Sequence, residues 1–109
     1  MNNKEKLKFV KRLFLEILKD RVESEEIKEL IDKAKTVEDI IEILKNKNLT
    51  PLEKDIELVK MIVKENIKKN QSIGVFSKMA LIAILEKNQP VKNILFELVD
   101  FINTKDLRK

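Results

Sequence analysis

The segment IGVFSKMALIAILEK, residues 73–87, decides the fold. A helix drawn through it is apolar on almost every side, and its apolar run over residues 79–85 is unbroken. A helix of this kind is normally enclosed by other helices, and Ala80 and Ala83 are small enough to let a neighbour approach closely. The segment is therefore predicted to be the buried hub of the molecule. The alternative interpretation is that one flank of it is an exposed site for a partner.

Helical signals continue through the rest of the chain, and no stretch has the strict alternation of a half-buried strand. Further helices are expected over residues 3–22, after Ser24, after Thr36, over residues 51–69 and from Pro90 to about residue 103. The pattern predicts a single all-α domain over residues 1–109, built as a compact bundle or orthogonal array of five to six helices of unequal length. The last three helices should form the core, with the first laid across them.

Two kinds of local signal set the helix ends. Thr50-Pro51-Leu52-Glu53 is the clearest start, with a threonine cap, proline at the first helical position, an inward-facing Leu52 and a glutamate that completes the capping box. Thr36 and Asp39 form a second box of the same type. Three helices are predicted to stop at a Lys-Asn pair whose asparagine takes the left-handed conformation; the pairs are residues 45–46, 69–70 and 87–88.

Missing residue types restrict the chemistry. The chain has no His, Cys, Trp or Tyr and only one Gly, so the usual acid-base, thiolate and phosphate-loop groups are absent from it. Glu25, Glu29 and Asp32 share a helix face on which a divalent cation is geometrically conceivable, but a solvated face with i,i+4 lysine partners explains them better. We therefore expect no enzyme activity, no catalytic residue, no cofactor and no metal.

The hydropathy pattern bears on location. The longest apolar run is far shorter than the roughly 20 residues that span a bilayer, and the first residues lack the apolar core of a signal peptide. A soluble, cytoplasmic protein is expected.

Apolar residues that lie off the expected core stripes suggest a surface for partners. Phe9 and Leu15 lie off the main stripe of the first helix, and Phe96 and Val99 lie opposite the stripe of the last one. Excess apolar residues on polar faces can mark protein–protein contact. The favoured hypothesis is a non-catalytic helical interaction module, adaptor or regulatory, that binds another protein, itself, or both.

The uneven charge supports an alternative hypothesis. The net charge is +4, yet residues 1–22 carry seven Lys/Arg against three acids, and residues 23–46 carry four against eight. Lysine stripes on the first and fourth helices could bind a nucleic-acid backbone; their members are Lys4, Lys8, Lys11, Arg12, Lys19, Lys60, Lys64 and Lys68. The lack of Tyr and Trp for base stacking makes nucleic-acid binding possible but not favoured.

A third hypothesis rests on length and lysine content alone. Small basic helical bundles include the bacteriocin immunity proteins, and the chain is similar to them in these two respects without sharing a motif.

Overall fold

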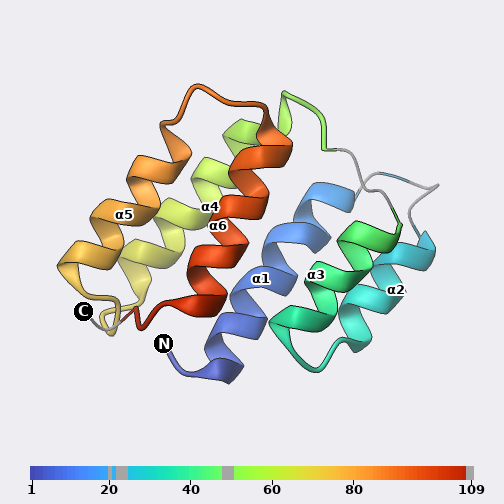
Figure 1. Cartoon of the computed structure of the whole chain (residues 1–109), viewed down its shortest axis with the longest axis horizontal. Helices are drawn as coiled ribbons and strands as arrows, with labels where there is room; N and C mark the ends of the chain where they lie inside the picture. The colour runs from blue at the N-terminus through green and yellow to red at the C-terminus, as the bar shows by residue number, and fades with distance from the viewer. Residues whose placement is uncertain (20, 22–24, 48–50, 108–109) are drawn as a thin grey trace.

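The computed structural model describes residues 1–19, 21, 25–47 and 51–107, which form an all-α molecule of 38 × 30 × 21 Å (Figure 1). The predicted fold class is confirmed. Six helices lie in these residues: α1 (Asn3–Leu18), α2 (Glu25–Lys33), α3 (Val37–Asn46), α4 (Asp55–Lys69), α5 (Val75–Leu85) and α6 (Val91–Thr104). The expected caps Ser24 and Thr50, and the end of the first helix at residue 22, lie outside the described residues.

The central helix is α1, which packs against α2, α3, α4 and α6. Its buried side chains cover more than one stripe, because neighbours contact it on several sides; they are Phe9, Val10, Leu13, Phe14, Ile17 and Leu18. Burying a side chain of this size contributes about 2 kcal/mol. The expectation that the last three helices form the core, with the first laid across them, is therefore wrong.

The segment predicted to be the hub lies at one edge of the molecule. Helix α5 packs against α4 and α6, while α2 and α3 lie on the other side of α1 (Figure 1). Only one side of α5 is buried, through Ser77, Leu81, Ile84 and Leu85. The hub prediction is wrong because α1 occupies the centre, so that α4 and α6 are the main neighbours of α5 among the described helices. The alternative interpretation of an exposed flank describes the structure.

Helix starts follow the predicted chemistry in part. The box at the start of α3 is confirmed, since the Thr36 hydroxyl accepts from the Asp39 amide and the Asp39 carboxylate accepts from the Thr36 amide, both at 3.1 Å. Helix α4 begins at Asp55 instead of Pro51, and Leu52 is exposed instead of inward-facing. The carboxylate of Asp55 accepts the Leu52 amide at 2.7 Å, which holds residues 52–54 in a turn before the helix.

Helix ends differ from the asparagine prediction. Asn70 follows α4 with φ −98° and ψ 97°, an extended conformation, so the predicted left-handed stop is wrong there. Its side-chain oxygen instead accepts from the amide and the hydroxyl of Ser72 at 3.1 and 2.6 Å, an Asx turn that redirects the chain. Helix α3 runs through Asn46 and is followed by Lys47 with φ −94°. Helix α5 ends at Leu85, before the predicted pair at 87–88.

Candidate functional site

The exposed side of α5 is the candidate site, and its five residues, Val75, Phe76, Met79, Ile82 and Ala83, are called the α5 face below. The exposed fractions are 80% for Phe76, 68% for Val75, 62% for Met79 and 38% for Ile82. These four side chains expose about 500 Å² together, taking about 200 Å² for a fully exposed large side chain. The largest apolar patch on a typical monomer covers about 300–600 Å² and is often functional.

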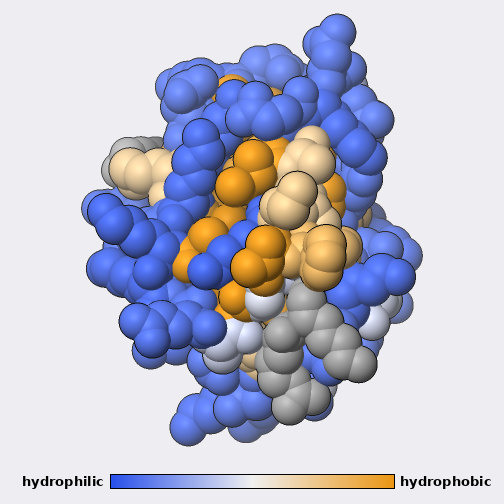
Figure 2. Space-filling view, turned by 90° about the vertical axis from the view of Figure 1, so that its left-hand side faces the viewer, coloured by the Kyte–Doolittle hydropathy of each residue, from blue (hydrophilic) through white to orange (hydrophobic). Residues whose placement is uncertain are grey.

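The spacing of these residues places them on one stripe. Val75, Met79 and Ile82 follow one another at intervals of four and three residues, while Phe76 and Ala83 lie one heptad apart beside them. Figure 2 views the molecule from the side on which α5 lies in Figure 1, and apolar residues gather in the middle of this side, with hydrophilic residues around them and a few hydrophilic atoms among them. The α5 face is therefore an apolar patch surrounded by polar residues, and its members are not isolated exposed residues.

The start of α5 is held in place by the chain that follows α6. The Gly74 amide donates to the Leu107 carbonyl at 2.7 Å, and Leu107 is fully buried. The sequence offered no signal for which side of α5 faces out. Its polar residues, Ser77 and Lys78, would ordinarily mark the solvent side, yet Ser77 is buried and Lys78 is half-buried.

Two of the four residues predicted for partner contact lie in the core. Phe9 and Val99 are each 1% exposed, so the expectation that they lie off the core stripes is wrong. The spacing could have indicated this, because Phe9 is four residues before Leu13 and Val99 is four residues after Leu95, and residues four apart share a helix face. A partner could contact these two side chains only if the helices separated.

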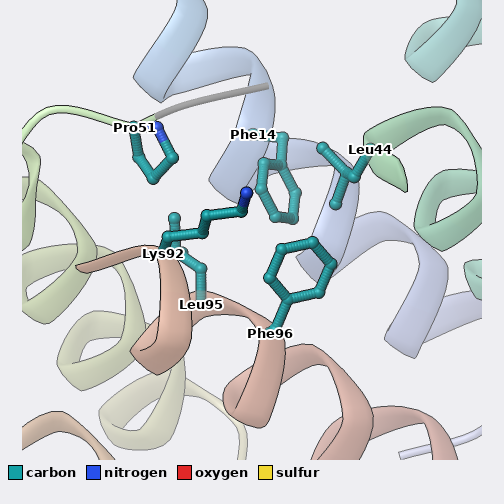
Figure 3. Close-up of a pocket in the computed structure, with 6 residues that line it drawn as sticks. All are labelled: Phe14, Leu44, Pro51, Lys92, Leu95 and Phe96. Atoms are coloured by element: carbon teal, nitrogen blue, oxygen red, sulfur yellow. The ribbon is translucent and has the colours of Figure 1, made fainter. Parts of the chain in front are cut away.

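The other two, Leu15 and Phe96, are half-buried and pack against the core. In Figure 3 the ring of Phe96 lies beside the ring of Phe14 and the side chain of Leu44, with Lys92 extending over the same hollow. The pocket between them is about 10 Å³, enough for one water-sized sphere. Phe96 therefore joins α6 to α1 and α3, and a partner contact by Phe96 or Leu15 stays a prediction.

The first lysine stripe is partly used inside the molecule. The Lys11 ammonium donates to the Asp32 carbonyl at the end of α2 at 2.7 Å, and Arg12 pairs with Glu65 on α4 at 3.1 Å. Lys4, Lys8 and Lys19 are exposed. Arg12 and Lys11 thus connect α1 to its neighbours, which reduces the charge they present to an external anion.

The second stripe lies on the neighbouring helix α4, where Lys64 and Lys68 are exposed and Lys60 is half-buried. Glu65 lies beside this stripe and accepts hydrogen bonds from Lys69 and Arg12 at 2.9 and 3.1 Å. Those two bonds, Lys69 first, lower the pKa of the Glu65 carboxyl below its ordinary value of 4.5. The carboxylate therefore separates the two stripes where α1 and α4 meet.

The acidic residues of α2 are exposed, and two of them pair with lysines. Lys28 contacts Glu25 at 2.9 Å, and Lys47, after α3, contacts Glu26 at 3.0 Å. Within the described part of the chain, no three acidic side chains gather in a way that could hold a metal ion. Glu25, Glu29 and Asp32 do not form such a group.

A polar hollow of about 390 Å³ lies between the starts of α1 and α3, lined by Lys4, Lys6 and Lys35 together with Glu38. The Lys6 ammonium donates to the Lys105 carbonyl at 2.7 Å, and both helix starts carry their own side-chain caps from Asn2 and Thr36. At the start of each of these helices, a side-chain cap therefore already accepts a hydrogen bond from a backbone amide.

Of the helices in residues 1–19, 21, 25–47 and 51–107, none has the length and hydropathy needed to cross a membrane. Comparison of the chain with protein-family models, with curated proteins and with solved structures finds no match.

Proposed function

We propose that the protein is a non-catalytic interaction module that binds a protein partner through the α5 face. The observation that carries this proposal is the exposure of Val75, Phe76 and Met79 on one helix stripe. Exposed apolar area is costly in water, and burying it against a partner is the main favourable contribution to protein association. Phenylalanine and methionine are also enriched in protein interfaces.

The geometry that supports the proposal is the packing of the buried side of α5 against the rest of the molecule. Leu81, Ile84 and Leu85 fix α5 against the body of the molecule, so its outer side chains are presented without the entropy cost of ordering a loop. The earlier candidates are weaker, because Phe9 and Val99 are buried and Phe96 contributes to packing between helices.

Site-specific photocrosslinking in cells that express the protein tests the proposal. A photoreactive phenylalanine analogue replaces Phe76 on the α5 face or, as the control, Leu30 on α2 at the far side of the molecule. Leu30 is a partly exposed apolar residue like Ile82. The expected result is a discrete protein adduct from position 76 and none from position 30.

The same experiment can contradict the proposal. Position 76 giving no adduct, or both positions giving the same weak smear of adducts, would mean that the α5 face has no protein partner under those conditions. A Met79→Ser variant provides the second control, because removing the central side chain of the face should abolish the adduct from position 76 while leaving the helical circular dichroism unchanged.

A further inference from the structure

We infer that the partner of the α5 face is a second copy of this chain, bound antiparallel across a two-fold axis that passes close to Met79. The inference rests on the proposed function, since it names the occupant of the same surface. Three observations support it: the size of the face, the order of side chains along it and the charge at its two ends.

The size of the face fits a weak dimer. Two copies would bury about 1,000 Å² in total, which is the smallest area expected for a specific interface and well below that of an obligate dimer. The monomer must therefore fold without its partner, and the described helices enclose a continuous core that needs no second chain. A weak and reversible association is expected for a contact of this size.

The order of side chains along α5 is self-complementary in the antiparallel direction. Met79 lies midway between the bulky end of the face, with Val75 and Phe76, and the end that holds Ala83. A two-fold axis near Met79 places the Phe76 ring of one copy over the Ala83 of the other, so a large side chain meets a small one at both ends. A parallel pair would instead place the two Phe76 rings together and the two Ala83 residues together.

The charges at the two ends of α5 favour the same direction. Exposed Glu86 directly follows the last residue of α5. At the other end, the first turn of α5 has no acidic residue, and Gly74 before it has no side chain that could cap the helix. In the antiparallel pair, Glu86 of each copy lies near the start of the other α5, where the helix dipole favours an anion. In a parallel pair, the two Glu86 carboxylates would lie side by side and repel each other.

Sedimentation of the purified chain over a range from about 1 µM to 1 mM measures the association. The expected result is a reversible monomer–dimer equilibrium, with a dissociation constant raised at least about tenfold by Phe76→Ser. Leu30→Ser, at the far side of the molecule, should leave the constant unchanged. A strictly monomeric chain at about 1 mM overturns the inference.

Introduced cysteines test the direction, because the chain has no cysteine of its own. Under mild oxidation, Met79→Cys should form a disulfide-linked dimer, since this residue meets its own copy near the axis. Phe76→Cys alone should not, but an equimolar mixture of Phe76→Cys and Ala83→Cys chains should give the mixed dimer. Efficient cross-linking of Phe76→Cys to itself would mean a parallel pair and would overturn the antiparallel arrangement.

The two proposals can fail separately. A purified chain that stays monomeric, together with an adduct to a different protein from position 76 in cells, overturns the second-copy inference and leaves the interaction surface standing. Absence of both dimer and adduct overturns both. An adduct in cells of twice the chain's own mass, abolished by Met79→Ser, supports both.

Discussion

At the residue scale, Asp55 is one of the two buried polar residues in the described part of the chain. Its carboxylate accepts from the Arg21 guanidinium at 2.5 Å and from the Leu52 amide at 2.7 Å, so it joins the chain after α1 to the start of α4. Both side chains of the ion pair are largely shielded from water. The pair is therefore more important to stability than the exposed pairs of the surface.

Asp55→Ala should lower the free energy of unfolding by about 3 kcal/mol, because it leaves a shielded guanidinium and an amide without this carboxylate. Glu57→Ala, an exposed carboxylate on the first turn of the same helix, should change it by less than about 0.5 kcal/mol. Urea denaturation followed by circular dichroism measures both. Equal effects of the two substitutions would contradict the structural role given to Asp55.

Asn66 is predicted to cost stability. Its side-chain oxygen is buried and has no hydrogen-bond partner. Leucine has a volume similar to that of asparagine and no polar atom to leave unpaired. Asn66→Leu should therefore raise the free energy of unfolding by about 1 kcal/mol. Asn70→Leu should lower it by a similar amount, because Asn70 bonds to Ser72 and to Glu5. Thermal unfolding of the two variants checks the opposite signs, and a lower midpoint for Asn66→Leu would contradict the expectation.

Residue-level sequence rules worked where the determining contacts are local. Thr36 and Asp39 are three residues apart and form the capping box that their spacing predicts. The predicted start of α4 at Pro51 is wrong, and Asp55 at the observed start pairs with Arg21, 34 residues earlier in the chain. Nothing in the local pattern reports that contact. The left-handed stop predicted at Asn70 is wrong for a local reason, because the Asn70 side chain bonds to Ser72 two residues later in an Asx turn, which competes with a left-handed cap.

At the element scale, the sequence predicts where the helices lie along the chain better than which side of each helix is buried. A helix as uniformly apolar as α5 has no polar stripe to indicate which way it faces, so its burial depends on how many neighbours reach it. The neighbours of α5 depend on α1, because the wide apolar surface of α1 packs against four other helices. The candidate site could be found in the sequence only as an alternative, since exposure of Phe76 and Met79 is a property of the assembled fold.

Paired substitutions on the two sides of α5 test this placement through stability. Leu81→Ala should lower the free energy of unfolding by about 3 kcal/mol, because it opens a cavity under the helix. Phe76→Ser should change it by less than about 0.5 kcal/mol at protein concentrations where the chain is monomeric. Chemical denaturation measures both, and a large loss for Phe76→Ser would mean that this ring is buried in the monomer.

The contact between α1 and α4 should make stability depend on pH. Lys69 and Arg12 lower the pKa of the Glu65 carboxyl in the folded state, so the ionised group stabilises the fold above the ordinary value of 4.5. This contribution is lost as the pH falls through the lower, folded-state pKa. The protein should therefore be more stable than Glu65→Gln near neutral pH, and the difference should vanish in acid.

Thermal unfolding of both proteins across this pH range measures that difference. About 1 M salt should reduce it at neutral pH, because the Glu65 side chain is 32% exposed and its ion pairs are screened by salt. A difference that grows as the pH falls would have the wrong sign.

At the scale of the whole molecule, the arrangement of helices separates charge from apolar surface. The α5 face lies at one end of the long axis and the acidic helix α2 at the other, with the basic helix α1 between them (Figure 1). Two basic residues of α1 are used within the molecule, since Lys11 bonds to a backbone carbonyl at the end of α2 and Arg12 pairs with Glu65 on α4. The net charge of +4 is spread over the other charged residues of the chain.

With this distribution we expect any nucleic-acid binding to be weak and strongly dependent on salt, because affinity for a phosphate backbone grows with the number of cations that contact it. Fluorescence anisotropy with a labelled DNA duplex should therefore detect no stable complex at about 0.15 M salt. Any binding at low salt should fall equally for Lys8→Glu and Lys64→Glu, since both residues are exposed and neither position would be specific. Binding that persists at physiological salt and is lost only when Lys64 and Lys68 are reversed would instead make the α4 stripe a nucleic-acid site, and the α5 face would no longer be the favoured functional surface.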